Sequence, residues 1–215
     1  MSHRLLLAAA CTLLLSGAAR ADIISGSFSG TMTDGMDTTG VFGAVGADLS
    51  NDPFTGTLVY DTDLFSQSVS GGVNSATGTG LGALTVTLTI SGHSYTFTDP
   101  TSSSLLIDSG SVSMESEFKA ANSNDNGTDM ESFFLDIIDP FTPFTNGTSL
   151  SQAINANPFV STGSFSIHDT APNVAAYGDF SITSLTTAAQ VPEPASLALL
   201  AVGLLGVVGI RRRAA

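Results

Sequence analysis

The sequence predicts an all-β protein: an antiparallel β-sandwich, jelly-roll-like or Greek-key, with an N-terminal signal peptide and a single C-terminal hydrophobic helix. Two observations predict the sandwich. Between residues 22 and 190, apolar side chains recur at every second position, and no window of a dozen residues shows a convincing helical period. Gly, Asn, Asp and Pro separate these alternating segments, which is typical of domains built from many short strands.

The first 21 residues have the three parts of a removable export signal. A short basic start precedes a mostly apolar run, residues 5–15, and the segment ends in the small-x-small sequence Ala19-Arg20-Ala21. The apolar run is shorter than the roughly 20 residues that span a bilayer. We therefore interpret the segment as a signal peptide and expect cleavage after Ala21, at the end of the small-x-small sequence. The single cysteine, Cys11, lies in this segment, and the mature protein is therefore expected to hold no disulfide.

The clearest strand runs from Leu84 to Ile90, where four aliphatic side chains alternate with three threonines. Such alternation is typical of a strand with one solvated face. The sequence Ser-Gly-His-Ser at 91–94 predicts a turn, and the alternation resumes at Tyr95, so residues 83–98 are expected to form a hairpin. Similar alternation predicts strands at Ile23–Thr33, Phe54–Tyr60, Val112–Phe118, Glu131–Ile138, Gly163–His168 and Tyr177–Leu185.

Polar or Gly-rich segments separate some of these strands, and we expect them to be long loops that hold any localised function. They are residues 35–53, 66–82, 120–129 and 139–157. Within Glu131–Ile138, residues 133–138 are apolar on both faces and are the best candidate for a central strand. The expected domains are a signal peptide at 1–21, a β-sandwich at 22–185, a linker at 186–190 and a C-terminal sorting signal at 191–215.

The central region is strongly acidic. All Asp and Glu residues of the chain except Glu193 lie between residues 22 and 190, where Lys119 is the single basic residue. A surface of this charge repels phosphate, because a nucleic-acid or anionic lipid partner needs Lys or Arg to neutralise it. The sequence therefore excludes nucleic acid as a partner.

The best metal candidate is the segment 122–131, in which oxygen-bearing side chains surround Gly127. Ca²⁺ takes six to eight oxygen ligands, and a glycine allows the sharp turn that a calcium loop needs. The candidate ligands are Asn122, Asn124, Asn126, Asp129 and Glu131. However, Asn122 stands where a calcium loop requires Asp, and Phe133 stands where it requires a bidentate Glu. We therefore favour a polar hairpin loop over a calcium site, and we expect no other cofactor.

Catalytic candidates are few. His93 and His168 are the histidines of the central region, and carboxylates recur two residues apart at Asp61/Asp63 and Glu115/Glu117. No Gly-x-Ser-x-Gly nucleophile elbow is present, and two histidines without cysteine leave only carboxylates to complete a zinc site. Solvated or structural roles are the interpretation we favour, so we expect no enzyme. An extracellular hydrolase that uses His168 or a carboxylate pair is the alternative.

The C-terminus has three ordered parts: Val191-Pro192-Glu193-Pro194, then sixteen uncharged and mostly apolar residues at 195–210, then Arg211, Arg212 and Arg213. A sixteen-residue helix is about 24 Å long, less than the roughly 30 Å of a hydrocarbon core. The arginines can snorkel and hold this end on the cytoplasmic side of the membrane. The two prolines keep the preceding segment extended, and thus accessible to a membrane protease.

This arrangement resembles the PEP-CTERM sorting signal of Gram-negative bacteria. The resemblance implies that an exosortase, an integral membrane enzyme with a cysteine nucleophile, recognises Pro192-Glu193-Pro194 and cuts near it. It also implies a transient inner-membrane intermediate and later delivery to the cell surface or extracellular matrix. Proteins with this signal occur in bacteria that make exopolysaccharide, and their signal carries no activity. The run Asp37–Gly43 also looks familiar from such proteins, without a role attached to it.

Together these features predict an exported, non-enzymatic surface or matrix protein associated with exopolysaccharide or a biofilm. The alternative is a carbohydrate- or calcium-binding β-sandwich module that uses loops such as 120–131.

Overall fold

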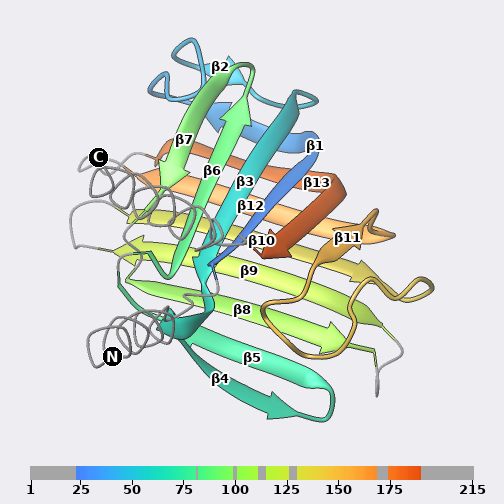
Figure 1. The fold of residues 1–215 in the computed structure, drawn as a ribbon. Coiled ribbons are helices and arrows are strands. Elements are labelled where there is room, and N and C mark those ends of the chain that lie inside the picture. Colours follow the sequence, from blue (N-terminus) through green and yellow to red (C-terminus); the bar gives the residue numbers. More distant parts are fainter. Residues whose placement is uncertain are drawn as a thin grey trace, which may run out of the picture. The chain divides into compact units, whose positions relative to one another are not determined.

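The computed structural model describes residues 23–80, 82–98, 101–110, 115–125, 130–168 and 174–189 of the 215-residue chain. These residues form an all-β domain with antiparallel strands and one short 3-10 helix, η1 (Thr62–Leu64) (Figure 1). No helix in these ranges is long and apolar enough to cross a membrane. The expected signal peptide, with Ala19 and Ala21, and the expected sorting signal at 191–215 lie outside the described residues.

The strands of the described ranges are β1 (Ile23–Asp37), β2 (Ala47–Asp48), β3 (Pro53–Asp61), β4 (Phe65–Ser70), β5 (Val73–Gly78), β6 (Leu84–Ile90), β7 (His93–Phe97), β8 (Ser102–Ser109), β9 (Ser116–Asp125), β10 (Met130–Asp139), β11 (Ile154–Ala156), β12 (Val160–His168) and β13 (Val174–Ala189).

All these strands belong to one hydrogen-bonded sheet in the order β4-β5-β8-β9-β10-β12-β13-β1-β3-β6-β7, with β11 beside β13 and β2 beside β1. The sheet folds over itself, so that β1, β3, β6 and β7 lie across β8, β9, β10 and β12 (Figure 1). The layering is sandwich-like, but the strand order differs from the expected jelly-roll or Greek-key order. Strands β8, β9, β10, β12 and β13 follow one another as a meander instead.

The two longest strands join the two layers. β1 and β13 pair along almost their full lengths, from Ile24 opposite Ala189 to Asp37 opposite Ala176. Their register shifts at Ser29/Gly30 and again between residues 32 and 34, and such bulges bend a strand and increase its twist. The bend allows β1 and β13 to connect the two layers, so one continuous sheet forms both layers instead of the two separate sheets of a sandwich. Because β13 continues to Ala189, most of the expected linker 186–190 is strand.

The core between the layers is rich in phenylalanine, and four of these rings lie opposite glycines on the neighbouring strand. The pairs are Phe28 with Gly56 and Phe54 with Gly30 between β1 and β3, and Phe165 with Gly178 and Phe180 with Gly163 between β12 and β13. A Cβ atom at Gly56 or Gly163 would overlap the facing ring. Each ring therefore occupies the space that a side chain would otherwise fill, an arrangement that stabilises glycines in sheets.

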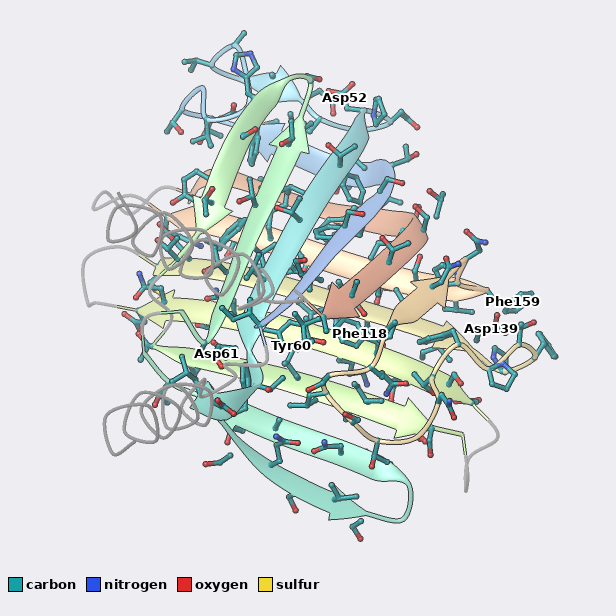
Figure 2. All side chains as sticks on the ribbon, in the orientation of Figure 1. Asp52, Tyr60, Asp61, Phe118, Asp139 and Phe159 are labelled. Atoms are coloured by element: carbon teal, nitrogen blue, oxygen red, sulfur yellow. The ribbon has the colours of Figure 1, made fainter. Side chains whose placement is uncertain are left out.

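Phe133 of β10 connects the aromatic rings of the two layers. Its ring centroid lies 5.8 Å from Phe28, 5.7 Å from Phe97 and 5.9 Å from Phe180. Aromatic pairs at these separations add to the stabilisation that burial alone provides. Figure 2 shows the side chains that fill the space between the layers, among them the fully buried Tyr60 and Phe118.

Most of the sequence-based strand predictions are confirmed. β1, β3, β6, β10, β12 and β13 cover the predicted segments, and β10 lies between β9 and β12 as a central strand. The hairpin at 83–98 is also confirmed. Its two turn residues, Ser91 and Gly92, have positive φ angles of 50° and 83°, as a tight two-residue turn requires.

Two of the expected loops are wrong. The segment 66–82 forms most of the β4–β5 hairpin, and the expected loop 120–129 is strand as far as Asp125. Of the expected strand Val112–Phe118, the last three residues are strand, because β9 begins at Ser116, and residues 112–114 lie outside the described residues. β8 has no counterpart among the predictions. These segments are rich in Ser, Thr and Asn, so the apolar alternation that marks the other strands is weak in them.

Substituting Gly56 by alanine tests the ring-over-glycine packing. The added methyl group overlaps the Phe28 ring, which neighbouring rings hold in place, so we expect Gly56→Ala to lower the free energy of unfolding by about 1–3 kcal/mol. Thr55→Val, one residue away on the solvated face, is the matched control and should change it by less than about 0.5 kcal/mol. Equal urea midpoints for Gly56→Ala and the control would contradict the packing account.

Candidate functional site

Asn122, the first expected calcium ligand, is buried in the core on β9. Its side-chain Nδ2 donates to the carbonyl oxygens of Leu84 at 2.9 Å and of Phe97 at 3.4 Å. These carbonyls belong to β6 and to the end of β7, in the opposite layer. The amide therefore links the two layers through the backbone of the opposite layer, and its own donor group is satisfied in the core.

Two of the other expected metal ligands, Asn124 and Glu131, lie on β9 and β10 near the described ends of these strands. Asn124 is opposite Glu131 in the strand register, and Glu131 accepts a hydrogen bond from the Tyr95 hydroxyl. Asn126 and Asp129 lie outside the described residues. Within the described part of the chain, no three His, Cys, Asp or Glu side chains gather as a metal ion would require.

The catalytic candidates are distributed over separate elements. His93 is exposed at the start of β7, and His168 is half-buried at the end of β12. Asp61 accepts a hydrogen bond from the backbone N–H of Asp63 at 3.0 Å and so caps η1. Asp61 therefore has a local structural role. It caps η1 through the backbone of Asp63, and the two carboxylates do not lie side by side on one face of a strand.

Asp37, the first residue of the run 37–43, accepts hydrogen bonds from four backbone N–H groups. It is fully buried at the end of β1. Its Oδ1 accepts from the backbone N–H groups of Thr39 at 3.2 Å, Gly40 at 2.7 Å and Val41 at 3.0 Å, and its Oδ2 from that of Phe42 at 2.6 Å. The carboxylate therefore folds the following loop around itself, and backbone N–H groups that converge in this way suit an anion.

The hydrogen bonds to Asp37 place the side chain of Phe42 in the core. Its side chain is 1% exposed, and its ring lies 5.3 Å from that of Phe165 in the core. Gly40 has φ of 88°, a conformation that residues with a side chain rarely adopt. The run Asp37–Gly43 is thus a structural device that fixes a long loop to the core. Its sequence signal is an aspartate three residues before a glycine, after a strand.

Asp37→Ala should destabilise the domain. The substitution leaves four backbone N–H groups without their acceptor, and we expect the free energy of unfolding to fall by at least about 2 kcal/mol. Asp48→Ala is the control, because this exposed carboxylate accepts from the backbone N–H and the side chain of Ser50, a neighbour in the same surface turn. Urea unfolding measures both variants. A loss in Asp37→Ala no larger than in Asp48→Ala would contradict this role.

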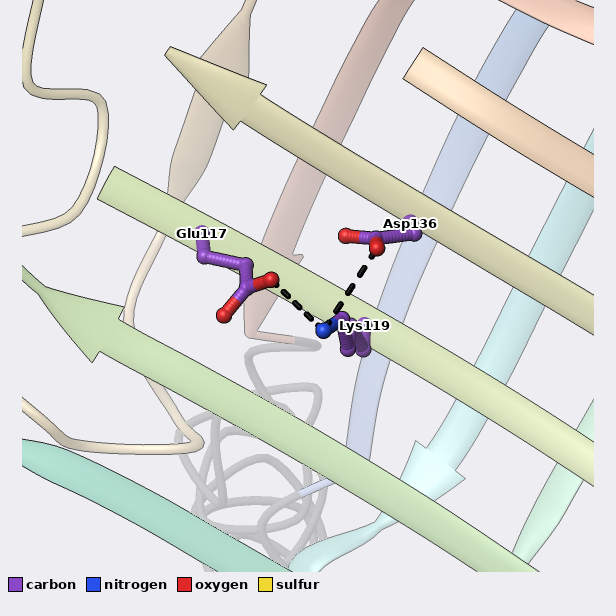
Figure 3. A network of polar contacts seen from close by, with 3 residues as sticks. All are labelled: Glu117, Lys119 and Asp136. Atoms are coloured by element: carbon purple, nitrogen blue, oxygen red, sulfur yellow. Dashed lines mark ion pairs between the residues drawn. The ribbon is translucent and has the colours of Figure 1, made fainter. Parts of the chain in front are cut away.

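Lys119, the single basic residue of the central region, lies on the outer face of β9 between two carboxylates (Figure 3). Its Nζ is 2.7 Å from Oε1 of Glu117 and 3.5 Å from Oδ2 of Asp136, which is its cross-strand neighbour on β10. The hydrogen bond to Glu117 raises the pKa of Lys119. Burial raises the pKa of Asp136, and the nearby lysine only partly opposes this effect.

Asp136 gives this cluster a pH dependence. Its Oδ1 is buried without a hydrogen-bond partner in the described structure. Because the pKa of Asp136 in the folded state lies above its ordinary value of 3.8, folding favours the protonated carboxyl. The corresponding contribution to stability is complete below pH 3.8 and is lost as the pH rises through the raised pKa.

Asp136→Asn removes this titration. Relative to the unmodified protein, the variant should therefore gain stability as the pH rises from about 3 to 7, whatever its absolute stability. Thermal melts across this pH range measure the difference in melting temperature between the two proteins. A difference that is constant with pH, or that changes in the opposite direction, would contradict the raised pKa.

The C-terminal end of the chain matches a known family model. Residues 190–213 match the PEP-CTERM protein-sorting motif. The resemblance found in the sequence is thereby confirmed, and the motif implies export and processing by exosortase. Comparisons with curated proteins and with solved structures find no significant match.

Proposed function

We propose that the chain is an exported surface or extracellular-matrix protein that associates with exopolysaccharide and has no catalytic activity. The observation that carries this proposal is the PEP-CTERM match at residues 190–213. In this account the signal peptide is removed after Ala21. The apolar segment 195–210 then holds the protein in the inner membrane, with Arg211, Arg212 and Arg213 on the cytoplasmic side, until exosortase cuts near Pro192-Glu193-Pro194.

The short length of the apolar segment supports a transient role for the anchor. Sixteen residues span about 24 Å as a helix, less than the hydrocarbon core of about 30 Å. A marginal anchor next to an extended Pro-Glu-Pro segment keeps the cleavage site near the membrane surface, where an integral membrane protease acts.

The folded domain suits a place outside the cell. Residues 22–190 contain no cysteine, so the domain holds no disulfide, and its loops are held by the aromatic core and by side-chain hydrogen bonds. Carboxylates that accept from nearby backbone N–H groups include Asp34, Asp37, Asp48, Asp61, Asp108 and Asp139. Many acidic residues thus have structural roles in turns, and their remaining charge keeps the surface hydrated and soluble.

Replacement of Pro192, Glu193 and Pro194 by alanine tests the sorting step. Exosortase should then fail to recognise the chain, so that full-length protein accumulates in the inner-membrane fraction. Pro143→Ala, in an exposed loop of the folded domain and outside the motif sequence, is the matched control and should be processed normally. Immunoblots of membrane and extracellular fractions measure the outcome. Normal processing of the triple variant would refute the sorting proposal.

A further inference from the structure

Five neighbouring strands present a regular array of hydroxyl groups on the outer face of their layer. The strands are β13, β1, β3, β6 and β7 (Figure 1). Aligned by register, one row consists of Ser184, Ser29, Thr55, Thr89 and Ser94, and the next row consists of Thr186, Ser27, Thr57, Thr87 and Thr96. We call these ten residues the hydroxyl face. None of them is buried, and none carries a charge.

Neighbouring hydroxyls on the outer strands of the face are already paired. Their oxygen atoms lie within hydrogen-bond distance in Ser27–Thr186 at 2.9 Å, Ser29–Ser184 at 2.8 Å, Thr87–Thr96 at 3.0 Å and Thr89–Ser94 at 2.8 Å. In the central strand, the hydroxyls of Thr55 and Thr57 have no such partner in the described structure. A hydroxyl has one donor and two acceptor positions, so even a paired hydroxyl keeps capacity for a ligand.

The face is hollowed along its centre. Two hollows of about 290 and 500 Å³ share Ser27, Thr57 and Thr186 as lining residues. The first extends over Thr55, Thr87 and Thr89, and the second continues past Val59 toward Ala188. Together they form a shallow trough across β13, β1, β3 and β6.

We propose that the hydroxyl face binds a segment of neutral polysaccharide. The proposal rests on the proposed association with exopolysaccharide and names the surface and the class of polymer. Sugar hydroxyls both donate and accept hydrogen bonds, as Ser and Thr hydroxyls do. Adjacent strands repeat every 4.7–4.9 Å or so, so the face offers equivalent groups at regular intervals, which suits a polymer of repeating units.

Two other occupants fit the face less well. An anionic polymer needs Lys or Arg, and Lys119, the one basic residue of the described domain, lies on β9 beside Glu117 and Asp136. A second copy of the chain would need an apolar interface core, whereas the larger apolar side chains that line the trough are Val59 at its edge and Phe28, which is buried beneath it. A neutral ligand also avoids the repulsion that the acidic domain exerts on anions.

The test is affinity electrophoresis of the protein purified from producing cells. Native gels contain hydroxyethylcellulose, dextran or mannan as neutral polymers, or alginate as the anionic comparator. At least one neutral polymer should retard the protein. Thr55→Val together with Thr57→Val removes the two unpaired hydroxyls but keeps β-branched side chains that strands favour, and binding should be about tenfold weaker.

The control variant is Ser132→Ala with Ser166→Ala. The oxygen atoms of this hydroxyl pair are 2.8 Å apart, as in the Ser29–Ser184 pair of the hydroxyl face. The pair lies on the outer face of β10 and β12, in the other layer. It should bind as tightly as the unmodified protein. Ser27→Ala with Thr186→Val is a second variant of the trough, used if the first melts at a lower temperature, and it should also weaken binding.

Several results would overturn the proposal. These are no retardation by any neutral polymer, retardation by alginate alone, or equal binding by the Thr55/Thr57 variant and the unmodified protein. Loss of self-association in this variant, measured by sedimentation, would assign the face to a second copy instead. Because sorting depends on residues 190–213, the same variant should reach the cell surface normally, so a failure of binding is distinguishable from a failure of sorting.

Discussion

The packing of four phenylalanine rings over four glycines is the constraint on which the rest of this domain depends. Across β1 and β3, and again across β12 and β13, each strand supplies one ring and one glycine to its neighbour. A side chain on any of these glycines meets atoms of the neighbouring strands. The reciprocal arrangement favours one register between the paired strands, because a shift of one residue would place the ring of the shifted strand on the solvated face.

The outer surface follows from this internal register. With Phe28 and Gly56 facing the core, their neighbours Ser27, Ser29, Thr55 and Thr57 must face solvent, because side chains alternate along a strand. The hydroxyl rows are therefore the outward counterpart of the aromatic core. Aspartate side chains fix the loops by accepting hydrogen bonds from backbone N–H groups. Asp37 accepts from Phe42 in this way, and Asp139 accepts from Phe141 and Thr142.

The sequence predicted the features that depend on local pattern. The strand at Leu84–Ile90 and its hairpin were predictable because aliphatic residues alternate with threonine around a Ser-Gly turn. The sorting motif was predictable because it is linear and needs no fold. The pairing of β1 with β13 was not predictable, because it joins residues about 150 positions apart and no local sequence pattern indicates which strands will pair.

The candidate site was predicted less well, for physical reasons. Alternating oxygen-bearing residues at 122–131 resemble a calcium loop, but in a strand the same alternation places Asn122 in the core, where it binds Leu84 and Phe97. The hydroxyl face depends on the register of five strands, so its individual serines and threonines are unremarkable in the sequence. Lys119 was visible as a lone base with Glu117 two residues before it, but its second partner, Asp136, depends on the β9–β10 hairpin, which the expected loop 120–129 obscured.

The central claim is that this domain is released from both of its terminal signals and delivered outside the cell. Mass spectrometry of the intact extracellular protein tests it most directly, because one spectrum fixes both ends of the mature chain. The account predicts an N-terminus at Asp22 and a C-terminus close to Pro192-Glu193-Pro194, without residues 195–215. An extracellular protein that retains Arg211, Arg212 and Arg213 would contradict it.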